Sequence, residues 1–293
     1  MPTFKYTGLD SPITEFALML VGRRDRHYYV VGSGMLIGPG AAITANHVIN
    51  ELHNFFDNQE AVVADPNNIT TQFTLQAIHF PHRRKSEAWA WDVRKVFHDD
   101  QTDLAFLQLH PTQEEQLSYV WRSPRLQLLP PPVGTEVSAF GYHSSVTEID
   151  ETSRRATITT NPYTSDGIVC EVHNYKRDSV VLPFPCFRTD SRFERGMSGG
   201  PVFTSTGNLC GIICTNFLSS SPEEDEEHTS YVTTLWPSMV IKVAFNRSGH
   251  PENVYYPAFE LVRDGFITAV DWDQFEYEHD LTTGIVTLRA PVV

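Results

Sequence analysis

Apolar and polar residues alternate along most of the chain in short runs that glycine, proline or polar turn residues bound. Such runs predict β-strands rather than helices. In the first half we expect strands at residues 13–21, 27–37, 41–44, 70–79, 88–97 and 104–109. In the second half, from residue 125 onward, we expect strands at 136–142, 147–161, 167–173, 180–182, 201–204, 209–216 and 231–235. The pattern predicts an all-β barrel or sandwich in two sets of strands.

Few segments interrupt this β pattern. Residues 46–55 have room for one or two helical turns, and Pro237 stands at a first helical position before an expected helix at 238–245. Residues 111–124 are the best linker candidate. We therefore expect three units, at residues 12–112, 125–245 and, as a C-terminal extension, 246–293.

The composition is that of a soluble globular protein, with 41% hydrophobic and 20% charged residues. The 22 basic and 36 acidic residues give a net charge of −14, which argues against nucleic-acid and anionic-membrane partners. No apolar run approaches the roughly 20 residues of a membrane helix. Residues 1–10 lack a basic segment followed by an apolar core, so we expect no signal peptide and a cytoplasmic location.

Neither the cysteines nor the histidines show the spacing of a metal site. Without an export signal, we expect reduced and buried thiols at all four cysteines, Cys170, Cys186, Cys210 and Cys214. His79 and His82 flank Pro81 and have no third ligand nearby, which favours a surface loop over a metal site. We therefore expect no metal.

Ser198 lies among glycines in Gly196-Met197-Ser198-Gly199-Gly200-Pro201. Glycines allow a tight fold in which backbone N–H groups turn toward one point, as the oxyanion of an acyl transfer requires. A serine hydroxyl also needs a general base and a group that orients this base. The candidates upstream are His47 in Thr-Ala-Asn-His-Val-Ile and Asp103 in Thr-Asp-Leu-Ala-Phe-Leu.

In the order His, Asp, Ser, these three segments resemble those of the chymotrypsin-like (trypsin-like) serine peptidases, with bacterial HtrA-type domains the most similar. The resemblance covers about residues 12–245. It implies two six-stranded antiparallel β-barrels, followed by a short C-terminal helix and the extension. The first barrel would carry His47 and Asp103, the second would carry Ser198, and the three would meet in the cleft between the barrels.

The resemblance also implies a serine endopeptidase that works through an acyl-enzyme. Ser198 would attack a peptide carbonyl, His47 would transfer its proton to the leaving amine, and Asp103 would orient the imidazole. The N–H groups of Gly196 and Ser198 would hold the oxyanion. Such an enzyme acts on proteins or peptides and needs neither a metal nor an organic cofactor.

By the same resemblance, five residues would contact the substrate. Arg192 would lie at the base of the primary pocket, and the others would form its walls, with substrate pairing along the first three: Cys214, Thr215, Asn216 and Ser230. Arg192 either points into the pocket and favours acidic side chains, or points outward and leaves a small mixed pocket. The acidic loop Glu223–Glu227 lies nearby and would disfavour acidic substrates.

Met197 departs from the pattern of secreted family members, which have an aspartate at this position to pair with a new N-terminus. Proteolytic activation of the trypsin kind is therefore not expected. The oxyanion loop either forms unaided or is ordered by a partner or ligand. The extension 246–293 is the surface for a regulatory protein partner, or it packs on the second barrel.

Two other functions compete with the peptidase interpretation. Gly196-x-Ser198-x-Gly200 also matches the nucleophile elbow of α/β-hydrolases, but a strand follows the serine and the triad order is wrong. The main alternative is a catalytically silent peptidase fold that binds a peptide or a partner. A flipped Met197 peptide, or a His47 that does not reach Ser198, would indicate an inactive resting state.

Overall fold

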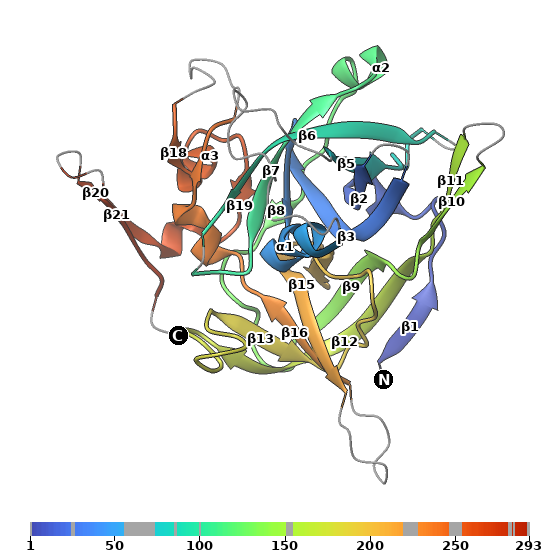
Figure 1. The fold of residues 1–293 in the computed structure, drawn as a ribbon. Coiled ribbons are helices and arrows are strands. Elements are labelled where there is room, and N and C mark those ends of the chain that lie inside the picture. Colours follow the sequence, from blue (N-terminus) through green and yellow to red (C-terminus); the bar gives the residue numbers. More distant parts are fainter. Residues whose placement is uncertain are drawn as a thin grey trace, which may run out of the picture.

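Two closed β-barrels stacked against each other make up most of the fold (Figure 1). The structure is a computed structural model, and it describes residues 2–24, 27–55, 74–84, 87–99, 101–150, 155–218, 228–245, 254–280, 283 and 285–291. In these parts of the chain, no helix has both the length and the apolar character needed to cross a membrane.

The first barrel is antiparallel and closes in the order β2-β3-β4-β7-β6-β5. Its strands are β2 (Ala17–Arg24), β3 (His27–Gly38), β4 (Ala41–Thr44), β5 (Thr74–His79), β6 (Trp89–His98) and β7 (Ala105–Pro111). Every second residue of β6 is buried, as a strand with one face on a core requires. Trp89 and Trp91 belong to this set and are each 2% exposed.

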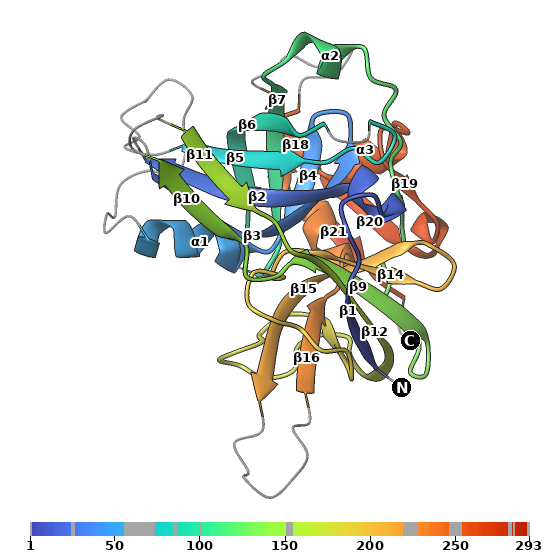
Figure 2. The same cartoon turned by 90° about the vertical axis from the view of Figure 1, so that its right-hand side faces the viewer.

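The second barrel is formed by six further antiparallel strands in the order β14-β9-β12-β13-β16-β15, and the pairing of β14 with β15 closes it. These strands are β9 (Glu136–Tyr142), β12 (Pro162–His173), β13 (Cys186–Thr189), β14 (Pro201–Thr204), β15 (Leu209–Leu218) and β16 (His228–Thr233). The expected fold of two six-stranded barrels is thereby confirmed. The strands β10 (Val146–Asp150) and β11 (Arg155–Thr159) lie between β9 and β12 in the sequence. They pair with each other as an antiparallel hairpin (Figure 2).

Short strands extend the second sheet at its margins. β1 (Thr3–Tyr6) pairs antiparallel with β12, whereas β8 (Arg125–Leu126) pairs parallel with both β15 and β19 (Thr268–Ala269). The two barrels meet at an apolar contact in which alternate residues of β2 pack against two aromatic residues of β9: Ala17, Met19, Val21, Phe140 and Tyr142. This contact sets how the two barrels face each other.

Several expected elements differ in the structure. The segment expected as a helix at 238–245 is instead a 3₁₀ helix, η2 (Trp236–Val240), followed by the strand β17 (Lys242–Val243). The strand expected at 180–182 does not form, because Asp178 Oδ1 accepts the N–H groups of Val180 and Val181 in a turn. The strands β1 and β13 were not expected.

The C-terminal extension contacts the first barrel through Phe266 and adds β19 to the sheet of the second barrel through β8. It contains β18 (Tyr256–Pro257), α3 (Phe259–Arg263), η3 (Trp272–Gln274) and the hairpin of β20 (Glu276–Asp280) with β21 (Ile285–Arg289). Just before it, Phe245 contacts the rings of Phe97 and Phe106, at centroid distances of 5.6 and 6.5 Å. Phe266 lies against Gly38, where a Cβ would be 2.8 Å from its ring. These rings extend the apolar core of the first barrel.

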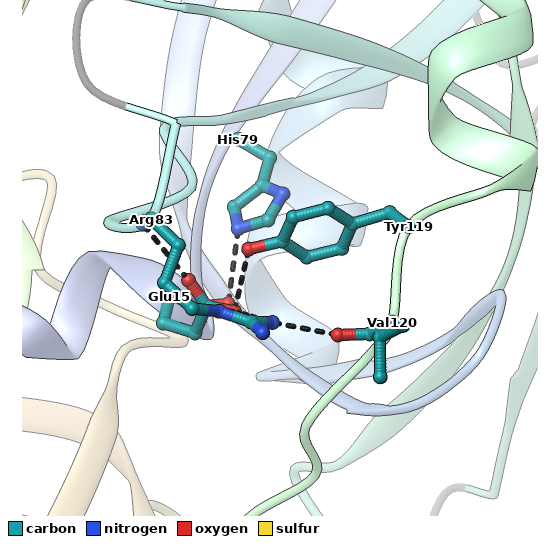
Figure 3. Close-up of polar contacts among 5 residues, drawn as sticks. All are labelled: Glu15, His79, Arg83, Tyr119 and Val120. Carbon is teal, nitrogen blue, oxygen red and sulfur yellow. Dashed lines mark hydrogen bonds and ion pairs between the residues drawn. The ribbon is translucent and has the colours of Figure 1, made fainter.

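The linker between the barrels is attached to the first barrel through the buried carboxylate of Glu15, in η1 (Pro12–Glu15) (Figure 3). This carboxylate accepts bonds from the Arg83 guanidinium (2.9 Å) and from the hydroxyl of Tyr119 (2.7 Å), which follows α2 (Glu114–Leu117). His79 Nε2 donates to the backbone oxygen of Glu15 (3.0 Å). The expectation of a surface loop at His79 was wrong, because its side chain is fully buried at the end of β5.

All four cysteines are free thiols. Three of them are buried, as expected, but Cys170 is half-buried on β12. Partial burial still raises the pKa of the Cys170 thiol, so this thiol is protonated at neutral pH.

Candidate active site

Strand pairing brings His47 and Asp103 to the same end of the first barrel. β4 ends at Thr44, opposite Ala105 of β7, and α1 (Asn46–Phe55) begins two residues after β4. His47 is the second residue of α1, and Asp103 lies two residues before β7. Asp103 Oδ1 accepts the backbone N–H of His47 (2.9 Å), and Oδ2 accepts Nδ1–H of its ring (2.7 Å). One carboxylate therefore fixes both the backbone and the imidazole.

This contact decides the protonation behaviour of His47. Burial lowers the pKa of His47, but the hydrogen bond and the charge of Asp103 raise it by more, so its pKa lies above the ordinary value. Nδ1 carries the proton that it donates, which leaves the Nε2 lone pair of the neutral ring available as a base. The side chain of His47 is 32% exposed and that of Asp103 only 10%.

Ser198 lies in a loop of the second barrel that docks against the first barrel. The N–H of Ser33 in β3 donates to the backbone oxygen of Ser198 (2.8 Å). Gly199 has φ +80°, and a Cβ there would be 2.2 Å from Thr44 Oγ1. A Cβ on Gly32 would be 2.9 Å from both the Ser198 oxygen and Val48 Cγ1, so the serine loop and α1 are neighbours. Glycines are required for this approach.

The segment before Ser198 is a turn that leaves two amides unengaged. The N–H of Met197 donates to Glu194 O (3.0 Å), and Gly196 has φ +90°, as a type II turn requires at its third position. The carbonyl of Arg195 accepts the N–H of Ser144 (3.2 Å), so the Gly196 N–H of the same trans peptide points the opposite way. Within the described residues, the N–H groups of Gly196 and Ser198 donate to no acceptor.

The contact between nucleophile and base is open. Among the residues that the structure describes, no hydrogen bond joins Ser198 Oγ to His47 Nε2. Hydrogen bonds of this kind are often long in unliganded sites and shorten when substrate binds. The orienting contact between His47 and Asp103 is therefore made in this state, and the contact to Ser198 is not.

Cys214 of β15 completes the surroundings of Asp103. Burial, together with the charge of Asp103, raises the pKa of its thiol well above the ordinary value, so the thiol is protonated at neutral pH. His47, Asp103 and Cys214 place a nitrogen, an oxygen and a sulfur within 4.8 Å of one another. A metal there would have to displace the protons on Nδ1 and on the thiol.

Of the other residues expected to contact substrate, four lie together on the neighbouring strands β15 and β16, whereas Arg192 points to solvent. Thr215 and Asn216 continue β15 beyond Cys214, and Ser230 of β16 pairs with Asn216. Ser230 is fully buried, and its hydroxyl has no partner in the described part of the chain. The side chain of Arg192 is instead 47% exposed and forms an ion pair with Glu194. The acidic loop Glu223–Glu227 lies outside the described residues.

Two features of the site went unnoticed in the sequence. The first is a hollow of ≈ 430 Å³ beside the oxyanion loop, lined among others by Tyr28, Tyr29, Arg195 and Gly196. The second is the hydroxyl of Ser33, which accepts the N–H of Tyr142 and donates to Gly196 O, both at 2.9 Å. Only the glycines on either side of Ser33 indicated a close-packed position there.

Two six-stranded barrels with this loop docked between them define the chymotrypsin-like class of fold. A family model described as a trypsin-like peptidase domain matches residues 32–212, more than half of the chain. The chain therefore belongs to the trypsin-like peptidase domain family. The resemblance inferred from the His47, Asp103 and Ser198 segments is confirmed to that extent.

A solved structure shows the same fold at low sequence identity, and a second has a weaker similarity. A crystal structure of Deg5 is similar over 77% of this chain and 86% of that chain, with a TM-score of 0.50 and 15% identity. The apo protease domain of MamO from Magnetospirillum magneticum matches over 76% of this chain and 93% of that chain, with a TM-score of 0.46 and 15% identity. A search of curated protein sequences finds no match.

Proposed function

We propose that this protein is a serine endopeptidase. His47 Nε2 removes the proton of Ser198 Oγ as this oxygen attacks a peptide carbonyl, and the same proton then passes to the leaving amine. Asp103 holds the ring and stabilises the imidazolium that forms. The N–H groups of Gly196 and Ser198 bind the oxyanion, and water hydrolyses the acyl-enzyme in a second round of the same chemistry.

One observation carries this proposal. Asp103 is bound to His47 through both carboxylate oxygens, while the two amides flanking Met197 are held without an acceptor of their own. The first contact orients a general base, and the second feature leaves two N–H groups free to donate to an oxyanion. Membership of the trypsin-like peptidase domain family supports proteins or peptides as the substrates. We propose that they pair as an added strand along Cys214–Asn216.

Covalent labelling with a fluorophosphonate probe tests the proposal directly. We expect one equivalent of label on Ser198, located by peptide mass mapping, and cleavage of an unfolded protein substrate. Ser198→Ala should lose both the label and the cleavage. Ser118→Ala, at an exposed serine after α2, is the matched control and should behave as wild type. Wild-type protein that never acquires label, or acquires it elsewhere, contradicts the proposal.

The absent hydrogen bond between Ser198 and His47 favours a second candidate, a peptidase fold that binds peptides or a partner without cleaving them. The two candidates differ in one measurement. If the protein is a binding module, wild type and Ser198→Ala should bind peptides along β15 with equal affinity, and neither protein should cleave them. A peptidase would consume the peptide only in the wild type. Peptide binding followed by fluorescence polarisation, with product analysis of the same samples, separates the two.

A further inference from the structure

The first strand of the chain belongs to the second barrel. β1 lies along β12 in antiparallel register, with Phe4 opposite Ser165 and Tyr6 opposite Tyr163 (Figure 1). The chain then crosses to the first barrel, where β2 begins. Residues of β1 alternate between two faces, so Phe4 and Tyr6 share one face and Lys5 lies on the other.

Phe4 is the residue of β1 with the most contacts around the serine loop. The guanidinium of Arg192 lies 5.0 Å from the centre of its ring. Tyr163 stacks on the ring at 4.7 Å, and His143 meets it edge-on at 5.8 Å. Phe4 also packs against the apolar core of the second barrel, to which Phe193 and Met197 belong.

These partners of Phe4 hold both ends of the turn that precedes Ser198. At one end, the N–H of Arg192 donates to Ser165 Oγ (2.8 Å), on the residue that faces Phe4 across the strands. At the other end, Nδ1–H of His143 donates to the carbonyl of Arg195 (3.2 Å). That carbonyl orients the peptide whose N–H belongs to Gly196.

From within the second barrel, the turn is also ordered by the N–H of Ser144, which donates to the Arg195 carbonyl (3.2 Å) beside His143. Met197 is fully buried and apolar, so it has no charge with which to form an ion pair. Gly196 accepts many backbone conformations, and its φ of +90° is only one of them. External contacts must therefore select the conformation in which the Gly196 N–H faces the substrate.

We propose that Phe4 of β1 is a positioning residue that holds residues 192–196 in the arrangement able to bind an oxyanion. This inference rests on the proposed peptidase function. Through its ring contacts with Arg192 and His143, Phe4 on this surface strand would order the loop on which the proposed chemistry depends. Because these ring contacts lead through His143 to the Arg195–Gly196 peptide, which carries a proposed oxyanion donor, they should affect turnover more than substrate affinity.

Three single variants test this in the full chain: Phe4→Ala, Phe4→Tyr and Lys5→Ala. Lys5 is the matched control, because its side chain is 64% exposed and forms its ion pair with Asp166 on the opposite face of the strand. For Phe4→Ala we expect kcat and the fluorophosphonate labelling rate to fall by about tenfold or more, with KM within about twofold of wild type. Phe4→Tyr, which keeps the ring, and Lys5→Ala should stay near wild type.

Amide hydrogen exchange supplies a readout that does not depend on catalysis. We expect Phe4→Ala to speed exchange in a peptide covering residues 192–198, while peptides of the first barrel exchange as in wild type. If wild type never labels, the peptidase proposal fails and the exchange still decides on Phe4. If wild type labels and Phe4→Ala matches it in labelling and exchange, the positioning role is overturned and the peptidase stands. Faster exchange spread over both barrels would also overturn it, since Phe4 would then only stabilise the fold.

Discussion

Ser33 offers the sharpest test of how the two barrels cooperate, because a single hydroxyl joins them at the oxyanion loop. Its Oγ accepts the N–H of Tyr142 and donates to the carbonyl of Gly196, while its own N–H donates to Ser198 O. The side chain is fully buried. Ser33→Ala removes only the two bonds of the hydroxyl and leaves the backbone bond to Ser198 in place.

The size of the effect follows from what each partner loses. The buried N–H of Tyr142 is left without an acceptor, at a cost of about 1–3 kcal/mol, and the Gly196 carbonyl loses a bond worth about 1 kcal/mol. We expect the free energy of unfolding to fall by about 2–4 kcal/mol. The released Gly196 can also turn its N–H away. We therefore expect kcat to fall by about 10- to 100-fold, less than the loss of an oxyanion donor outright, with KM little changed.

Urea denaturation gives the stability, and initial rates on a peptide substrate give kcat and KM. The matched control is Thr14→Val, which removes a buried hydroxyl that donates to Leu9 O (3.1 Å) and Ser11 O (2.8 Å), far from the site. Thr14→Val should lose stability and keep kcat. If Ser33→Ala likewise lost only stability, the hydroxyl would be a structural link alone and the positioning argument would fail.

Two further predictions concern pH. Burial lowers the pKa of His47 and Asp103 raises it by more, so the rate should fall as the pH drops through a value above that of free histidine. In Asp103→Asn the acid limb of the rate profile, measured from pH 5 to 9, should move to lower pH while kcat falls by about 10⁴-fold; an unmoved limb would contradict this origin of the shift. Burial lowers the pKa of His79 to about 4, so between about pH 6.5 and 4 the unfolded chain binds a proton that the folded chain excludes. The free energy of unfolding should therefore fall by about 3 kcal/mol as the pH drops across this window, and urea melts of His79→Gln, which keeps the donor to Glu15, should show a flatter dependence.

The candidate triad could be predicted from the sequence because each of its three residues lies in a short motif with a recognisable local pattern. His47 follows a four-residue strand and is the second residue of α1, which occupies all of 46–55, where one or two helical turns were expected. Ser198 is enclosed by glycines that the docking against β3 requires. Short motifs of this kind carry their own backbone geometry, so they can be interpreted before the fold is known.

What the sequence did not reveal depends on distant partners. β1 has four residues, and its partner strand β12 comes more than 150 positions later, so no local pattern indicates it. The expected helix after Pro237 fails because Val243 and Phe245 are buried on β18 and the first barrel, which draws the chain out of helical geometry. The sequence left two orientations open for Arg192. The structure shows the outward one, with the guanidinium 5.0 Å from the centre of the ring of Phe4, which lies far away in the sequence.

Met197 connects these observations. A carboxylate at this position would be surrounded by apolar side chains of the second barrel, where an unpaired charge is strongly unfavourable. The chain has instead a buried methionine, whose side chain fills space against Gly141 but makes no hydrogen bond to the turn. The direction of the Gly196 amide must then come from groups outside the turn, namely Ser33 on the first barrel and the Ser144 N–H and the partners of Phe4 on the second. The proposed oxyanion site, ordered from both sides, then forms only when the two barrels and β1 are assembled, so its competence reports on the whole fold rather than on one loop.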